Sequence, residues 1–188
     1  SAQRPHGEAG TDAGFGLPIA SAERWALDGG FASLPEPVDP RQRHTLVALP
    51  GGRAMVLGGA TRTGLTNLAE LWSPLDGGGW EQPERSLSMG LGSHSATALD
   101  GGDVLVVGGE PVSSVDTPRA QRYLAAEQRW CLAGELKNGR KQHTATLLSS
   151  GKLLVVGGLS AGIVEATAEL WEPRAGRCDE PPGPTLDW

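Results

Sequence analysis

Three of the four histidines recur at nearly equal intervals along the chain. His44, His94 and His143 lie 50 and 49 residues apart, and three imidazoles are one of the ligand sets that proteins use to hold zinc. A residue that recurs once in every copy of a repeated unit is, however, expected to do the same structural work in each copy. Separate copies also hold these side chains farther apart than the roughly 2 Å metal–nitrogen bonds of one zinc ion permit. We therefore predict hydrogen-bonded histidines at strand starts, with no metal and no cofactor.

The remaining motifs give little support for catalysis. The diglycines at 58–59, 108–109 and 157–158 superficially resemble phosphate loops, but no helical pattern follows them, so no helix N-terminus is available to bind an anion. They are expected to end a strand with a turn. Ser93 precedes His94 at a strand entry and not in a nucleophile elbow. The fourth histidine, His6, has no expected partner.

The loops after the diglycines are the predicted place for recognition. The loops 60–67, 110–117 and 159–166 differ in sequence while the segments on either side repeat, as expected of a scaffold that keeps its frame and varies its loops. The polar side chains of these loops are the candidate ligand contacts: Arg62, Asn67, Glu110, Asp116, Ser160 and Glu165. A catalytic pair of carboxylates among them is less well supported than simple solvation.

The elements that position these residues are predicted from a repeat. In each unit the first glycine of the diglycine follows the histidine by 14 residues, and an aromatic residue follows it by 28 or 29, at Trp72, Tyr123 and Trp171. In the last unit, 143–148 and 153–156 are β-prone and flank a turn, 167–171 forms a third strand, and a short fourth strand carries Cys178. Each unit is therefore predicted to be a four-stranded antiparallel sheet without helices.

The repeat also divides the chain. The expected segments are a flexible leader at 1–16, a partial unit with outer strands only at 17–36, complete units at 37–84, 85–135 and 136–180, and a C-terminal tail at 181–188.

This combination of landmarks resembles the kelch repeat of β-propellers, and the segments Gly-Lys-Leu-Leu-Val-Val-Gly-Gly and Ala-Glu-Leu-Trp-Glu-Pro look especially like its bacterial form. The departures are Tyr123 in place of Trp, Cys178 in place of the second Trp, and Leu91 in place of the arginine present at Arg41 and Arg140. The resemblance implies an all-β propeller with three full blades and a partial N-terminal blade.

The resemblance also bears on function. A propeller of six or seven blades needs about 300 to 350 residues, so this stretch is expected to leave an open arc. A second copy, a complementary propeller chain or the remainder of a cleaved protein would complete the ring. The leading prediction is a non-catalytic module for protein or carbohydrate binding and assembly. The alternative is part of a carbohydrate-active kelch enzyme, of the oxidase or isomerase type, whose site needs the missing blades. The copper-oxidase type is disfavoured because Tyr123 is the only tyrosine.

Composition limits the possible ligands and the cellular location. The net charge is −6 and no cluster of Lys and Arg is present, which disfavours nucleic-acid binding. No apolar run is long enough to cross a bilayer, and no signal-peptide core is present. Cys131 and Cys178 fall at nearly equivalent places in successive units, and the sequence leaves open whether they form a disulfide or act as small apolar residues. An abundance of Arg, Ala and Gly hints at a bacterial source, and an extracytoplasmic or secreted location is expected.

Overall fold

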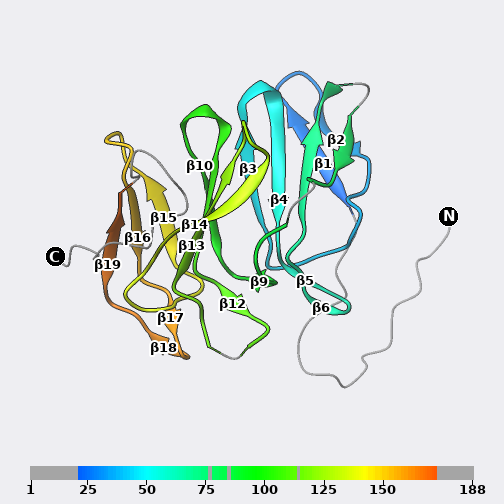
Figure 1. Ribbon diagram of the computed structural model, residues 1–188. Coiled ribbons are helices and arrows are strands. Elements are labelled where there is room, and N and C mark those ends of the chain that lie inside the picture. The colour runs from blue at the N-terminus through cyan, green and yellow to red at the C-terminus, as the bar shows by residue number, and fades with distance from the viewer. Residues whose placement is uncertain (1–20, 76–77, 84–85, 114, 173–188) are drawn as a thin grey trace.

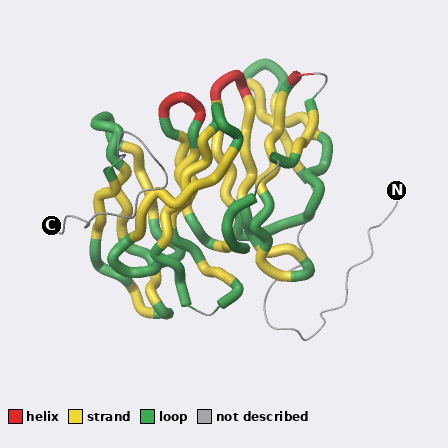
Figure 2. Tube along the Cα trace, in the orientation of Figure 1, coloured by secondary structure: helices red, strands yellow, loops and turns green. Residues whose placement is uncertain are grey.

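The protein is built of short antiparallel strands (Figure 1). The computed structural model describes residues 21–75, 78–83, 86–113 and 115–172. Within these ranges the helical turns that are described in full are two three-residue 3₁₀ segments, Pro50–Gly52 and Asp100–Gly102, each in a hairpin turn (Figure 2). The predicted all-β class is thereby confirmed, whereas the expected leader at 1–16 and tail at 181–188 lie outside the described residues.

The predicted four-stranded unit appears twice in full. The first sheet has the order β3-β4-β7-β8, with strands Thr45–Leu49, Arg53–Leu57, Ala69–Ser73 and Gly79–Glu81. The second sheet has the order β10-β11-β13-β14, with strands Ser95–Ala98, Val104–Val107, Arg119–Leu124 and Arg129–Glu135. Short turns join the first strand to the second and the third to the fourth, so these pairs are antiparallel. Longer connections, which contain β5 (Ala60–Thr61) and β6 (Gly64–Leu65) or β12 (Glu110–Pro111), join the second strand to the third.

Two incomplete sheets flank these. The third sheet has the order β15-β16-β19, with strands Thr144–Leu147, Leu153–Val156 and Ala168–Trp171. The fourth strand predicted around Cys178 lies beyond the last described residue. At the other end of the chain, β1 (Ala22–Ala26) and β2 (Gly30–Leu34) form a separate two-stranded hairpin.

Three small two-stranded sheets occupy one end of the molecule, at the bottom of Figure 1. They are β5 with β6 (Ala60–Thr61 and Gly64–Leu65), β9 with β12 (Leu91–Gly92 and Glu110–Pro111), and β17 with β18 (Leu159–Ser160 and Ile163–Val164). Their chain segments include the variable loops after the diglycines. The structure thus gathers these loops at one end.

The core lies between neighbouring sheets. Strand β11 shows why, because its side chains alternate between two clusters. Val104 and Val106 pack with Met55 and Leu57 of the first sheet, while Leu105 and Val107 pack with residues of the third sheet, including Val155. A strand covered on both faces needs an uninterrupted apolar run, and burying each such side chain contributes about 1.5 to 3 kcal/mol.

Cys131 of β14 is disulfide-bonded. The other cysteine of the sequence, Cys178, lies outside the described residues. For Cys131 the structure therefore favours a disulfide over a small apolar residue. In the described part of the chain no helix is long and apolar enough to cross a bilayer.

Candidate functional site: the diglycine end of the three sheets

The residue before each repeated histidine has an unusual backbone conformation. Arg43, Ser93 and Gln142 adopt φ angles of 58°, 56° and 56°, in the left-handed region that costs a non-glycine residue roughly 1 to 2 kcal/mol. Hydrogen bonds link them across the sheets, because the Ser93 N–H donates to the Arg43 carbonyl at 3.0 Å and the Gln142 N–H donates to the Ser93 carbonyl at 2.9 Å. These three residues, which we call the left-handed row, differ in type although their neighbours repeat.

Charged side chains form a network beside the left-handed row. The Arg43 guanidinium donates to Ser93 Oγ at 3.1 Å and forms an ion pair with Glu110. Lys141 Nζ lies 3.4 Å from Glu110 Oε2 and 3.5 Å from Asp116 Oδ1. Two cations and two carboxylates therefore alternate. Partly exposed pairs of this kind each contribute up to about 1 kcal/mol, so the network orders the surface more than it stabilises the fold.

The structure brings together two of the six predicted contact residues, Glu110 and Asp116. Asp116 is buried and also accepts a hydrogen bond from the Ala161 N–H at 3.0 Å, which ties the 112–117 loop to the β17–β18 hairpin.

The other four predicted contact residues lie outside this charged network. Asn67 donates to the Leu87 carbonyl at 3.1 Å, and Glu165 accepts from Thr167 Oγ1 at 2.8 Å. Arg62 is exposed in the turn between β5 and β6, and Ser160 is half-buried in β17. A role in ligand binding stays a prediction for all six.

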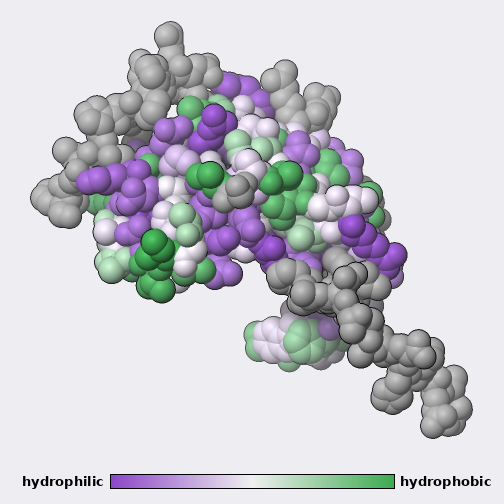
Figure 3. All heavy atoms as spheres, turned by 90° about the horizontal axis from the view of Figure 1, so that it is seen from below, coloured by the Kyte–Doolittle hydropathy of each residue, from purple (hydrophilic) through white to green (hydrophobic). Residues whose placement is uncertain are grey.

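An apolar patch borders the network. The side chains of Val112, Val115, Ile163 and Val164 are 78%, 71%, 73% and 78% exposed, and the Asp116–Ala161 hydrogen bond holds their two segments together. We call these four residues the Val–Ile patch. Figure 3 views the molecule from this end, where apolar and hydrophilic surfaces alternate. Sequence reasoning missed both the patch and the left-handed row, although the row had a signal in its fixed place before each histidine.

The histidines join neighbouring sheets and do not converge on one point. His94 Nε2 lies 2.8 Å from Thr45 Oγ1 of the first sheet, and His143 Nε2 lies 2.8 Å from Ser95 Oγ of the second. In both residues Nδ1 is buried without a partner of good hydrogen-bond geometry among the described residues. The backbone of Leu57 beside His94, and that of Arg140 beside His143, raises the pKa of each imidazole by less than burial lowers it.

Burial disfavours the charged form of both imidazoles. Burial lowers the pKa of His94 to about 4, with smaller contributions from the charges of His143 and His44. Burial and then the Arg140 charge lower the pKa of His143 to about 4. Both imidazoles are therefore neutral at pH 7.

The diglycines also meet the next sheet. A Cβ on Gly58 would lie 2.6 Å from the Leu91 carbonyl oxygen, and one on Gly108 would lie 2.4 Å from that of Arg140. The amides that follow donate to these same oxygens, Gly59 N–H at 2.7 Å and Gly109 N–H at 2.8 Å. These N–H groups are therefore occupied, and no helix follows them. The diglycines of the first and second sheets serve sheet packing and not anion binding.

A buried ion pair recurs within the first and third sheets. Arg41 pairs with Glu70, and Arg140 pairs with Glu169. The Arg41 guanidinium also donates to the carbonyls of Gly58 at 3.1 Å and Leu68 at 3.2 Å.

In the second sheet the equivalent residues are Leu91 and Gln121, so both charges are replaced together. Gln121 Oε1 still accepts the Ser88 N–H at 2.8 Å, as Glu70 Oε2 accepts the Val38 N–H at 2.7 Å. The amide thus keeps the backbone contact and removes a carboxylate that would have no cation.

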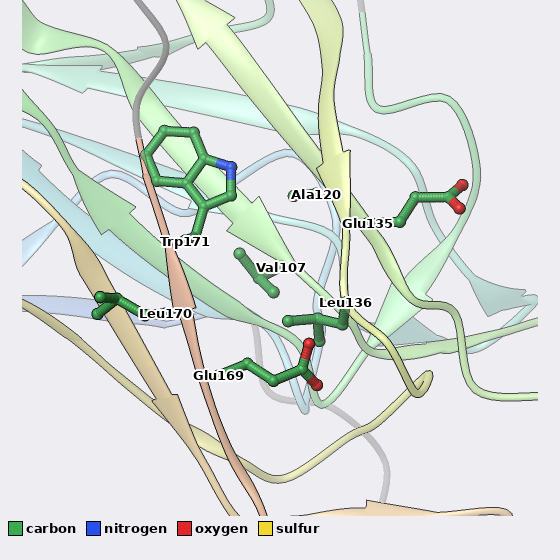
Figure 4. Close-up of a pocket in the computed structure, with 7 residues that line it drawn as sticks. All are labelled: Val107, Ala120, Glu135, Leu136, Glu169, Leu170 and Trp171. Carbon is green, nitrogen blue, oxygen red and sulfur yellow. The ribbon is translucent and has the colours of Figure 1, made fainter. Parts of the chain in front are cut away.

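An apolar pocket lies between the second and third sheets (Figure 4). Its lining residues are Val107, Ala120, Glu135, Leu136, Glu169, Leu170 and Trp171. The Glu169 carboxylate is already paired with Arg140, and the Trp171 indole donates to the Ala133 carbonyl at 2.9 Å. The pocket is therefore a packing seam with its main polar groups engaged.

Comparison with known proteins identifies no relative: no protein-family model matches the chain, and no curated protein matches it.

Proposed function

We propose that the three sheets are successive blades of a kelch-type β-propeller, and that this protein is a non-catalytic binding and assembly module completed into a ring by a second polypeptide. The repeat supports the blade assignment, since one set of contacts joins the first sheet to the second and recurs between the second and the third. These contacts are the diglycine bond, the bond between His and a hydroxyl, and the backbone bond along the left-handed row.

The uncovered outer face of the third sheet, seen among the described residues, is the observation that carries the proposal. Gly158 is the counterpart of Gly59 and Gly109, yet its N–H has no acceptor among the described residues. A Cβ on Gly157 would meet only the Glu165 carbonyl of its own sheet, at 3.7 Å. The outward-facing Val156 is 43% exposed. A further sheet of the same kind would satisfy the amide and cover this face.

The diglycine end supports recognition of a protein. The Val–Ile patch beside a charged network offers an apolar centre with a polar border, which is the usual anatomy of a protein–protein contact. The disulfide at Cys131 suits an oxidising compartment, so we place the assembly outside the cytoplasm.

Native mass spectrometry together with light scattering tests the proposal. We expect the folded protein to have a mass above that of one chain, either as a second copy or as a complex with a complementary chain. A folded, soluble monomer at micromolar concentration would refute ring completion. Metal analysis of the native assembly addresses the alternative function, because stoichiometric copper would favour a carbohydrate-active enzyme over a binding module.

A further inference from the structure

The N-terminal hairpin corresponds to the outer half of a complete sheet. Strand β1 contains Ala-Glu-Arg-Trp, which matches the Ala-Glu-Leu-Trp of β7 and β19. Its cross-strand pair of Trp25 with Phe31 corresponds to Trp72 with Trp80 and to Tyr123 with Trp130. Strand β1 is therefore the counterpart of β7, β13 and β19.

One edge of β1 is open. Its three counterparts pair with a second strand of the unit, namely β4, β11 and β16. Among the described residues β1 pairs only with β2, and the hairpin stands at the right-hand end of the row of sheets (Figure 1). Trp25 is 56% exposed, whereas Trp72 is 7% exposed. In the part of the chain that the structure describes, no strand therefore pairs with this edge of β1, and no sheet covers Trp25.

Glu23 shows what the missing segment must carry. It occupies the position of Glu70 and Glu169, which are paired with Arg41 and Arg140 from the segment just before the first strand of their own sheets. Glu23 is exposed and has no ion-pair partner in the described part of the chain. The expected partner is an arginine.

His44 points to a second group. The imidazoles of His94 and His143 bond to hydroxyls of the preceding sheet, Thr45 Oγ1 and Ser95 Oγ. Within the described ranges no hydroxyl lies within hydrogen-bond distance of the His44 imidazole. The preceding sheet of His44 is the one to which β1 belongs. The same missing segment should therefore supply a Ser or Thr hydroxyl.

The spacing of these two groups is fixed by the complete units. Arg41 precedes Thr45 by four residues, and Arg140 precedes Thr144 by four. One segment with the sequence Arg-x-x-x-Ser/Thr, followed by a β-hairpin, thus matches Glu23 and His44 at once. Neither residues 1–20 nor residues 173–188 contain this spacing, and Arg41 and Arg140 are buried in their own ion pairs. None of the 188 residues therefore fits this place, whether they come from this copy or from a second one.

We propose that the open edge of β1 is the docking site for a β-hairpin of a partner polypeptide that begins with Arg-x-x-x-Ser/Thr. The second strand of the hairpin pairs antiparallel with β1 and covers Trp25. Its arginine binds Glu23, and its hydroxyl binds His44. The inference rests on the proposed ring completion and names the partner's chemistry at one of the two open ends.

A synthetic peptide with the sequence of residues 137–158 is the probe, because it carries the Arg140 and Thr144 spacing in a hairpin sequence. We expect the full-length protein to bind this peptide with a blue shift of Trp25 fluorescence, which is lost in the Trp25→Phe variant. Glu23→Gln should weaken binding at least 10-fold. Glu81→Gln, which changes another exposed strand glutamate, is the matched control and should leave binding unchanged.

The second sheet supplies a more selective arm. In that sheet Leu91 and Gln121 replace the arginine and the glutamate together. The peptide with Arg140→Leu should therefore bind the Glu23→Gln protein more tightly than the unchanged protein. The unmodified peptide should show the opposite preference. Absence of peptide binding, or equal binding by the Glu23→Gln protein, would overturn the inference. Native mass separates this failure from that of the proposed function, since an assembly insensitive to Glu23 leaves ring completion standing.

Discussion

Removing one member of the Arg41–Glu70 pair should cost far more than removing both. Both side chains are almost fully buried, at 2% and 0% exposure. Arg41→Leu leaves the Glu70 carboxylate buried with only the Val38 N–H as a donor, and Glu70→Gln leaves the guanidinium without a counter-charge. Breaking a buried pair in this way costs about 3 to 5 kcal/mol. The two single variants should therefore lose about 6 to 10 kcal/mol between them.

The double variant Arg41→Leu with Glu70→Gln reproduces the arrangement of the second sheet. It removes both charges and keeps the amide oxygen that accepts the Val38 N–H. The remaining loss is that of the three bonds from Arg41 to the carbonyls of Asp39, Gly58 and Leu68, at about 0.7 kcal/mol each. We therefore expect the double variant to lose about 2 kcal/mol, less than either single variant.

Urea denaturation followed by tryptophan fluorescence measures all four proteins at pH 7. The quantity of interest is the coupling free energy of the double-mutant cycle, expected to be at least about 4 kcal/mol. Arg122→Leu with Asp103→Asn, which changes a less buried pair, is the control cycle and should give a coupling below about 2 kcal/mol. Additive losses at Arg41 and Glu70 would refute the idea that Leu91 and Gln121 are a joint substitution.

Three further predictions address other parts of the chain. The pKa of His94 is about 4 in the folded state and near 6.5 in the unfolded state, so its contribution to stability should be fully present above pH 6.5 and fall towards pH 4, with about 2 kcal/mol lost at pH 5. Urea denaturation at several pH values should show that the unfolding free energy of His94→Asn depends less on pH. An unchanged pH dependence in this variant would contradict the prediction. Gly108→Ala should lower the unfolding free energy by at least about 3 kcal/mol, through backbone strain and overlap with the Arg140 carbonyl. Gly157 has a similar φ, 68° against 61° at Gly108, but no neighbouring sheet, so Gly157→Ala should cost about 1 kcal/mol in the isolated chain. Equal losses in the two variants would show that the third sheet is already covered. Cys131→Ser should lower the unfolding free energy by about 2 to 4 kcal/mol under oxidising conditions and have little effect in reductant, and an effect of equal size in both would assign the loss to packing.

The sheets were predictable because their landmarks are local and periodic. Three local features define β16: the turn before it, the apolar run Leu153–Val156 and the diglycine after it. A single short apolar run does not distinguish a strand from a helix, but its repetition at a nearly constant interval does. The strands around Trp72 and Tyr123 followed from the same interval. Their arrangement relative to one another did not, because it depends on contacts between residues about 50 positions apart.

The chemistry at the diglycine end was harder to foresee. Arg43 and Gln142 adopt the left-handed backbone conformation, in which Gly or Asn is the usual residue. Hydrogen bonds from neighbouring sheets stabilise that conformation here. Leu91 was visible as a departure from the repeat, but its link to Gln121 emerged only when the structure showed the arginine and glutamate of the sister sheets in contact. Ile163 and Val164 belong to a β-prone segment, and no pattern around them predicts that both side chains are exposed.

The close approach at Gly58 and Gly108 has a geometric consequence. At this end of the molecule, backbone meets backbone with no side chain between, while larger residues such as Met55, Leu57 and Val104 separate the sheets farther along the strands. Two sheets that are pinched at one point and spaced at another must be rotated relative to each other. In an array of repeated units a small rotation at each step determines the curvature of the whole. The absence of a Cβ at these glycines therefore helps to set the angle between neighbouring sheets.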